Sequence, residues 1–360
     1  MQQQIVKKDF KEHFAKLVSE FKFSNCLIVT SNGNEERGYP DYFINELENN
    51  KCNISLYKIN EYPNFFSISN IFEENYHKNI DLILSIGGGS VLDISKILAA
   101  CKLPKNSMEV ITDLELSSDD KIFNISIPTT AGSGAESTKF ATIWSKSTKQ
   151  KYSFEDPKLL PEVAYFIPEY TTSLPKFLTL TTALDALCHS IDSLWNKKSN
   201  SNSIDLSIQS TNQINTYLPK LLREMDNIDY RYQLLDASNL AGRAINITRT
   251  SLNHSISYPL TNLYDLPHGY ACAFSIVSIC NEYEKEIRQL PFANTIFEAR
   301  DLISAVDLAS LFKDYLIDLD IDLVCNNVFD NKRLSNFLFD LSHEKLNRIL
   351  SHARDYYVEL

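Results

Sequence analysis

The sequence lacks the features that mark several large classes of protein. Its seven cysteines form no CxxC pair, and such an odd, scattered set is typical of reduced thiols in a cytoplasm rather than of a disulfide framework. The N-terminal stretch MQQQIVKKDFKEHF has no apolar signal core, and nowhere do about 18 apolar residues run together. We therefore expect a cytoplasmic protein without a membrane partner.

Basic charge and glycine are also scarce. The net charge is −11 and no segment is dense in lysine or arginine, so nucleic acid is not an expected partner. Only 9 glycines occur in 360 residues, which gives weight to the places where they cluster. A chain of this length, 44% hydrophobic, is long enough for two domains with separate cores.

The order of the apolar segments predicts an α/β first half and a helical second half. Strand-like runs such as 25–33 and 53–59 alternate with helix candidates at 43–50 and 71–79, which is typical of a parallel sheet covered on both faces. Beyond residue 172, helical periodicity replaces the strands. We expect an α/β domain over residues 1–172 and an all-helical domain over residues 173–360. The segment 331–360 is predicted to form two amphipathic helices.

Two glycine-rich turns follow predicted strands. In SIGGGSVLDISK (85–96), three glycines lead into a helix that we expect to open at Ser90. This arrangement suits a pyrophosphate at a helix N-terminus, but a tight turn without a ligand explains it about equally well. The turn PTTAGSGAE (128–136) adds hydroxyl groups at the same sheet edge, and the pair favours a dinucleotide. Neither turn fits GxGxxG or a P-loop, which disfavours a kinase or P-loop hydrolase.

A carboxylate and three histidines form a candidate metal site. Asp185 and His189 are four residues apart in a helix candidate, so they share one face. His254 and His268, the second held in a Pro-His-Gly turn, supply two more imidazoles. One carboxylate with three imidazoles suits Fe²⁺ or Zn²⁺. The alternative is a solvated helix pair beside ordinary buried histidines.

Together these motifs resemble the iron-containing (group III) alcohol dehydrogenase family. The resemblance covers most of the chain, from CLIVT through GGGSVLDISK, PTTAGSGAE and DALCHSID to HSISYPL and PHG. It implies that residues 1–172 form a Rossmann-like dinucleotide-binding domain and that the helical residues 173–360 bind metal and substrate. It also implies Fe²⁺ or Zn²⁺, NADH or NADPH, and a homodimer. The metal ligands that it implies are Asp185, His189, His254 and His268. The cofactor contacts that it implies are, at the pyrophosphate, Gly87, Gly88, Gly89 and Ser90; at the nicotinamide, Asp93, Thr129, Thr130, Ser133 and Lys151; and at the adenine, Pro168 and Thr171.

Two positions depart from the family pattern. Many members carry an aspartate after the first strand, where it repels a 2′-phosphate. Here Ser31 leaves the choice between NAD and NADP open. Tyr258 stands where simple alcohol dehydrogenases often have a histidine. A phenol with a reference pKa of about 10 is a poor base at neutral pH, so we expect another proton route, a substrate contact or simple core packing for Tyr258.

Arg249 points to the substrate. It lies five residues before His254, where simple members have a small residue, and an arginine near a metal cation calls for an accompanying anion. Its planar guanidinium group can form bidentate hydrogen bonds to phosphonate, phosphate or carboxylate, and Arg243 is a candidate second contact. The alternative is a structural salt bridge to Asp265. This region looks like the phosphonoacetaldehyde reductase branch, which implies hydride transfer to phosphonoacetaldehyde, giving 2-hydroxyethylphosphonate. Arg249 and Tyr258 are our candidate catalytic residues.

Three other functions compete with this interpretation. A general alcohol, aldehyde or diol dehydrogenase would act on neutral substrates. A lyase resembling dehydroquinate synthase shares the architecture, but it needs more basic residues around a sugar phosphate than this sequence offers. A catalytically inactive binding protein is disfavoured by the complete set of four ligands.

Overall fold

The computed structural model describes residues 3–59, 78–100, 121–145, 150–306, 318–329 and 332–359, with the single positions 68, 70, 71, 74, 75, 308, 312 and 315. Contacts divide the chain into two compact units. The first comprises Met1–Thr130 and Ala135–Ser173, and the second comprises Ala131–Gly134 and Leu174–Leu360. The domain limits 1–172 and 173–360 stay a prediction, and they differ from the two units chiefly at residues 131–134.

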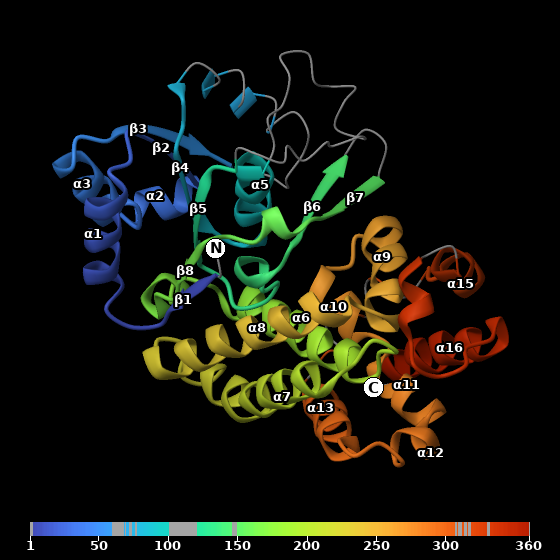
Figure 1. Ribbon diagram of the computed structural model, residues 1–360. Helices are drawn as coiled ribbons and strands as arrows, with labels where there is room; N and C mark the ends of the chain where they lie inside the picture. Colours follow the sequence, from blue (N-terminus) through green and yellow to red (C-terminus); the bar gives the residue numbers. More distant parts are fainter. Residues whose placement is uncertain are drawn as a thin grey trace. The chain divides into compact units, whose positions relative to one another are not determined.

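The first unit is built on a parallel sheet of six strands (Figure 1). The sheet order is β1-β8-β5-β4-β2-β3, and every pair is parallel. The strands are β1 (Gln4–Val6), β2 (Asn25–Thr30), β3 (Asn53–Lys58), β4 (Leu82–Gly87), β5 (Phe123–Pro128) and β8 (Val163–Tyr165). The near-continuous burial of β2, β4 and β5 matches their apolar sequences, as a sheet covered on both faces requires.

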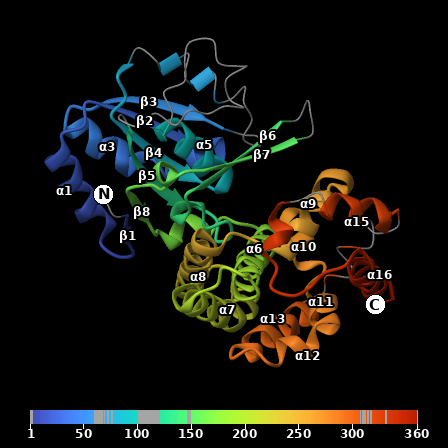
Figure 2. The same ribbon diagram turned by 45° about the vertical axis from the view of Figure 1, so that its right-hand side comes forward.

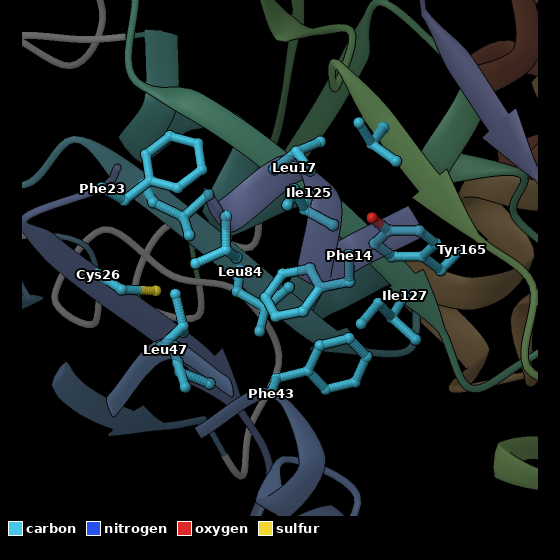
Figure 3. Close-up of a cluster of buried hydrophobic side chains, with 14 of the residues drawn as sticks. Phe14, Leu17, Phe23, Cys26, Phe43, Leu47, Leu84, Ile125, Ile127 and Tyr165 are labelled. Carbon is cyan, nitrogen blue, oxygen red and sulfur yellow. The ribbon is translucent and has the colours of Figure 1, made fainter. Parts of the chain in front are cut away.

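Helices cover both faces of this sheet. Leu27 and Ile28 are neighbours in β2 but pack into different hydrophobic clusters, because successive side chains of a strand point to opposite faces. In the cluster of Figure 3, Phe14 packs edge-on against Phe43 and Tyr165. The helices of this unit are α1 (Phe10–Phe21), α2 (Asn32–Glu36), α3 (Asp41–Asn49) and α5 (Gly89–Ala100), with short 3₁₀ turns η3 (Ala135–Ser137), η4 (Pro157–Leu159) and η5 (Pro168–Thr171). The predicted Rossmann-like α/β fold is confirmed.

Two features of the first unit differ from the sequence prediction or fall outside it. An antiparallel hairpin of β6 (Phe140–Ser145) and β7 (Gln150–Glu155) forms a separate sheet that the alternating pattern did not predict. The helix candidate 71–79 lies partly outside the described residues.

The second unit is helical. Its described backbone forms no strand beyond a single bridge between Asn196 and Phe337. Its elements are α6 (Lys176–Leu194), α7 (Ser201–Leu221), α8 (Ile228–Thr248), α9 (Leu252–Tyr264), α10 (His268–Ala273), α11 (Ile276–Glu282), α12 (Glu284–Ile287), α13 (Ala293–Ala305), α15 (Ile321–Phe329), η6 (Lys332–Asn336) and α16 (His343–Glu359). Figure 2 shows α6, α7 and α8 side by side, as their mutual contacts require. Among the described helices, none has both the length and the hydropathy to cross a membrane.

The prediction of two amphipathic helices over 331–360 is only half right. Residues 343–359 form α16, but the earlier part forms the short turn η6 and then an irregular segment with one bridge at Phe337. The backbone N–H of Leu338 donates to the carbonyl of Trp195, and Asn336 donates from its side chain to the carbonyl of Thr250. These tertiary hydrogen bonds hold the chain against the end of α6 in place of a continued helix.

Candidate functional site

Helix α6 carries three acidic or imidazole side chains on one face. Asp185, His189 and Asp192 follow one another at spacings of four and three residues, which places them on the same side of the helix. All three are buried, and Asp192 is completely enclosed. The segment has no proline or glycine, so one unbroken helix fixes their relative positions.

The neighbouring helices supply two more histidines. His254 lies in the first turn of α9, and His268 is the first residue of α10, with Pro267 as its N-cap. The prediction that His268 sits in a turn rather than a helix is therefore wrong. Gly269 allows α10 to lie directly on α6, because a β-carbon there would overlap the backbone oxygen of Thr181.

Three imidazoles converge on one carboxylate oxygen. Asp185 Oδ1 lies 3.3 Å from His254 Nε2, 3.7 Å from His189 Nε2 and 3.8 Å from His268 Nε2. The His189 and His254 rings are stacked, with their centres 4.5 Å apart. The structure thus brings together the four side chains that the sequence singled out. One carboxylate and three imidazole nitrogens at such spacing fit an Fe²⁺ or Zn²⁺ ion.

The charges around Asp185 favour its ionised form. Burial raises the pKa of this carboxyl, but the His189 charge, the hydrogen bond with His254 and the His268 charge together hold the pKa well below its usual range. Burial lowers the pKa of His189 to about 4. Burial also lowers the pKa of His254, but the charge of Cys272 and the hydrogen bond with Asp185 outweigh it and hold that pKa well above its usual value. A metal ligand set requires an ionised carboxylate and neutral imidazoles, so an ion bound there would displace the proton from His254 Nε2.

Asp192 is a functional residue that the sequence reasoning missed. Its Oδ2 lies 2.8 Å from His254 Nδ1 and accepts the backbone N–H of Ser251 at 2.9 Å. Its Oδ1 accepts from Trp195 Nε1 at 3.1 Å and from the backbone of Asn253 at 3.1 Å. With its Nδ1 proton held by Asp192, His254 presents Nε2 toward Asp185, the arrangement that orients metal-ligating histidines. The signal was present in the motif DALCHSID, where Asp192 is one turn beyond His189.

Cys272 is a second residue that the sequence reasoning missed. Its Sγ lies 3.7 Å from His268 Nε2 and 3.9 Å from Asp185 Oδ1. The donor atoms of Asp185, His254, His268 and Cys272 all lie within 4.8 Å of one another. His268 and Cys272 are i and i+4 in α10, so the spacing in PHGYACAF was the available signal.

Tyr258 stands next to this cluster. Its ring is parallel to that of His268, with an interplanar angle of 8° and centres 6.2 Å apart. The guanidinium carbon of Arg333, in η6, lies 5.0 Å from the centre of the Tyr258 ring. Sequence reasoning gave no role to Arg333, because nothing in the local sequence connects η6 with α9. Arg249, the substrate-binding candidate from the sequence, is exposed and is the C-cap of α8, with a positive φ of 64°. Arg243 is also exposed.

The first glycine turn and the start of the second, residues 128–130, are neighbours in the first unit, whereas residues 131–134 of the second turn belong to the second unit. Gly87, at the end of β4, pairs with Pro128 of β5, and Thr129 donates its N–H to the carbonyl of Gly87 at 3.0 Å. A β-carbon on Gly88 would lie 3.3 Å from the Thr130 side chain. Helix α5 starts at Gly89, one residue before the predicted Ser90. The first turn and the start of the second thus meet at the carboxyl edge of the sheet, as predicted, with the N-terminus of α5 beside them.

The remaining predicted cofactor residues are more scattered. Ser31 caps α2 by accepting the N–H of Asn34, and Thr171 donates its hydroxyl to the carbonyl of Pro168 at 2.7 Å, within η5 beyond β8. Ser133 belongs to the second unit. Lys151 lies in β7, and its side chain is outside the described part of the structure.

Asp93 is engaged by groups of the protein. It accepts a hydrogen bond from the Thr142 backbone at 2.9 Å and pairs with the Lys96 ammonium at 3.1 Å. Lys96 is fully buried and also donates to Thr138 at 3.1 Å and to the Phe140 carbonyl. This pair therefore anchors α5 to the start of the hairpin, a structural link that the sequence reasoning missed.

Comparisons with known proteins agree with this architecture. The family profile described as iron-containing alcohol dehydrogenase matches residues 2–168, and the profile of the Fe-containing alcohol dehydrogenase C-terminal domain matches residues 179–353. Phosphonoacetaldehyde reductase of Streptomyces viridochromogenes is 32% identical over 203 residues, which cover 54% of this chain and 51% of that protein. NAD-dependent methanol dehydrogenase of Bacillus methanolicus is 33% identical over 212 residues, covering 56% and 55%. The alignments thus span about half the length of these two relatives.

Alignments that cover most of the chain also find alcohol dehydrogenases and related reductases. Alcohol dehydrogenase 4 of Schizosaccharomyces pombe is 26% identical over 356 residues, which cover 94% of this chain and 84% of that protein. A solved iron-containing alcohol dehydrogenase superimposes with a TM-score of 0.82 at 24% identity, covering 98% and 97% of the two chains. Sulfoacetaldehyde reductase of Bifidobacterium kashiwanohense, solved with NAD⁺, gives 0.83 at 21% identity over 98% and 97%, and at these identities both structures show the fold. The chain belongs to the iron-containing alcohol dehydrogenase family of oxidoreductases.

Proposed function

We propose that this protein is a metal-dependent reductase that uses NADH or NADPH to convert a small anionic aldehyde to its alcohol. The preferred substrate is phosphonoacetaldehyde, and the product is 2-hydroxyethylphosphonate. The observation that carries the proposal is the convergence of three imidazole nitrogens on Asp185 Oδ1 in a buried cluster of the second unit. Family membership favours this chemistry over the lyase and the inactive binding protein considered above.

The residues of the cluster have separate proposed roles. Asp185, His189, His254 and His268 hold the iron or zinc ion. A divalent ion bound there supplies Lewis acidity toward a carbonyl oxygen, and a bound nicotinamide supplies the hydride. Asp192 fixes the tautomer of His254 through the 2.8 Å contact at Nδ1. All of these side chains except the half-buried His268 are buried, so most of the geometry is set before a substrate arrives.

The nucleotide belongs at the carboxyl edge of the first unit. Four parallel strands, β8, β5, β4 and β2, end side by side there, and ligands of open α/β sheets bind at that edge. The residues proposed to contact the cofactor from this edge are Ser31, Gly87, Gly88, Gly89, Ser90, Thr129, Thr130, Pro168 and Thr171. Asp93, Ser133 and Lys151 stay predictions that rest on the family resemblance alone.

The phenol of Tyr258 can serve as a proton donor in aldehyde reduction. A phenol is protonated at neutral pH and can donate a proton to the product oxygen, whereas it is a poor base for alcohol oxidation. Its ring lies parallel to that of His268, at the border of the ligand cluster. We therefore assign Tyr258 to substrate contact or proton donation.

The anionic end of the substrate calls for a cation close to this border. Arg333 lies over Tyr258, and a guanidinium there can pair with phosphonate in bidentate fashion. Arg249 stays the candidate from the sequence. The relative named phosphonoacetaldehyde reductase supports an anionic aldehyde, and the relative named methanol dehydrogenase supports the alternative, a dehydrogenase of neutral alcohols and aldehydes.

A substrate panel tests the proposed function. Enzyme reconstituted with iron or zinc is assayed with phosphonoacetaldehyde, butanal and lactaldehyde, each with NADH and with NADPH. We expect the highest kcat/KM for phosphonoacetaldehyde. Higher kcat/KM for the neutral aldehydes would replace the proposal with the general dehydrogenase.

Two arginine variants test how the anion is held. We expect Arg333→Ala and Arg249→Ala to raise KM for phosphonoacetaldehyde by at least about tenfold, the loss of one to three charge-assisted hydrogen bonds, while KM for butanal changes little. Arg223→Ala, an exposed arginine just beyond α7 with no proposed role, is the matched control. If a variant lowers kcat/KM equally for both aldehydes, that arginine does not bind the anion.

A further inference from the structure

The ligand cluster contains one donor more than the four that the sequence singled out. Cys272 Sγ lies 3.7 Å from His268 Nε2 and 3.9 Å from Asp185 Oδ1, and it is fully buried. His189 approaches the cluster from the other side, with Nε2 3.7 Å from Asp185 Oδ1 and its ring stacked on His254.

The spacing of these atoms matches that of ligands around one ion. Metal–nitrogen and metal–oxygen bonds of about 2.0–2.2 Å and a zinc–sulfur bond of about 2.3 Å place tetrahedral donors about 3.3–3.8 Å apart. Asp185 to His254, at 3.3 Å, and Cys272 to His268, at 3.7 Å, fall in that range, and Cys272 to Asp185, at 3.9 Å, lies just above it. The group in which every donor lies within 4.8 Å of every other consists of Asp185, His254, His268 and Cys272.

We propose that Cys272 coordinates the metal through its sulfur, which makes the centre a mixed site of oxygen, nitrogen and sulfur donors. This inference rests on the metal site of the proposed function and extends it by one ligand. On binding, the thiol S–H bond breaks, the proton passes to water, and the sulfur electron pair forms the bond to the ion. No electrons are transferred in this step. A thiolate is a soft ligand, so the site favours Zn²⁺ or Co²⁺ over hard cations such as Mg²⁺.

The competing explanation is that Cys272 is a small apolar residue filling the interior. Free cysteines are among the most buried residue types, and Cys188 and Cys280 are buried as well. Cys280, in α11, lies outside the group of mutually close donors. It provides a control of the same residue type and burial.

X-ray absorption at the zinc edge tests the inference on the wild-type full chain. After removal of metal by chelation and addition of one equivalent of Zn²⁺, we expect a sulfur scatterer at about 2.3 Å beside nitrogen and oxygen at about 2.0–2.2 Å. A shell of nitrogen and oxygen only would overturn sulfur ligation and leave the metal site of the proposed function standing. Failure to bind zinc in the cluster would overturn both.

Substitution assigns the sulfur to its residue. The Co²⁺ form of the wild type should show a sulfur-to-cobalt charge-transfer band in the near ultraviolet. Cys272→Ser should lose this band and bind Zn²⁺ at least about tenfold more weakly, as measured by chelator competition. Cys280→Ser should keep both, and far-ultraviolet circular dichroism shows whether each variant is folded. A Cys272→Ser protein that retains the band contradicts the inference.

Discussion

At the scale of single residues, the buried carboxylate of Asp192 shows how the site is positioned. It contacts the proposed ligand His254 at Nδ1. It also accepts hydrogen bonds from Trp195 at the end of α6 and from the backbone at the start of α9. Burial raises the pKa of Asp192, but the hydrogen bond and charge of His254 lower it below its usual value. An ionised Asp192 therefore stabilises the fold and orients a ligand at once.

Replacing Asp192 by asparagine should weaken metal binding. The amide has one oxygen in place of two, and its NH₂ group would face the backbone donors of Ser251 and His254. We expect Asp192→Asn to lower zinc affinity by about 10–100-fold and stability by about 1–3 kcal/mol. Chelator competition and urea unfolding of the metal-free protein measure the two effects.

The matched control is Asp236→Asn, which changes a buried acid hydrogen-bonded to Gln213 on the paired helices α7 and α8. It should affect stability without changing zinc affinity. If Asp192→Asn binds zinc as tightly as the wild type, Asp192 does not position His254.

The sequence predicted some of these residues and not others, for physical reasons. Asp185 and His189 were accessible because helical spacing alone places them on one face. Asp192 and Cys272 follow the same rule in helices and could have been found by continuing the pattern by one turn. Arg333 could not, because its approach to Tyr258 depends on how η6 packs on α9.

At the scale of elements, the contact between α6 and α10 determines the geometry of the ligand cluster. Asp185 and His189 lie on α6, and His268 and Cys272 lie on α10. The helices approach so closely at Gly269 that no side chain fits there. The absence of a β-carbon at this position therefore lets the proposed metal ligands on the two helices come together.

Gly269→Ala should separate the two helices. The added methyl group would overlap the Thr181 carbonyl, a backbone atom that cannot move aside as a side-chain end could. We expect a loss of about 1–3 kcal/mol in stability and at least about tenfold weaker zinc binding. Gly33→Ala is the control, because the new methyl group would meet only the flexible end of Arg37. Unchanged zinc affinity in Gly269→Ala would show that the helices tolerate the methyl group without moving the ligands.

Elements built from local patterns were predictable, and those that depend on tertiary contacts were not. The buried strands and α6 follow from apolar runs and helical periodicity. The hairpin of β6 and β7 was missed because its strands pair with each other outside the main sheet. The pattern predicted two helices after residue 331, but only α16 forms, because hydrogen bonds to Trp195 and Thr250 hold the part around Asn336 and Leu338 in a different conformation.

At the scale of the whole molecule, the chain consists of an α/β unit and a helical unit, which explains why one family profile matches each half of the sequence. The change from alternating strands to helices near residue 172 was visible in the sequence. The grouping of residues 131–134 with the helical unit was not visible, because it depends on tertiary packing. Gly134 lies so close to α8 that a β-carbon added to it would be 2.6 Å from Gly242. The homodimer stays a prediction.

Metal should stabilise the second unit specifically. An ion that binds only the folded protein adds about 2.7 kcal/mol at a free concentration about 100-fold above Kd, which raises Tm by several degrees. Calorimetry with and without chelator should therefore show an increase in Tm on adding zinc, and Asp185→Asn should abolish it. An identical melting curve with and without zinc in the wild type would contradict a metal site in this cluster.

The edge strand β1 has a consequence for how the chain is made. Gln4 pairs with Val163, and Val6 with Tyr165, so β1 is synthesised well before the strand with which it pairs. Parallel pairing between such distant segments requires the closure of a long loop, which carries an entropic cost. Completion of the sheet must therefore await β8, and until then the outer side of β5 has no strand beside it and β1 has no partner.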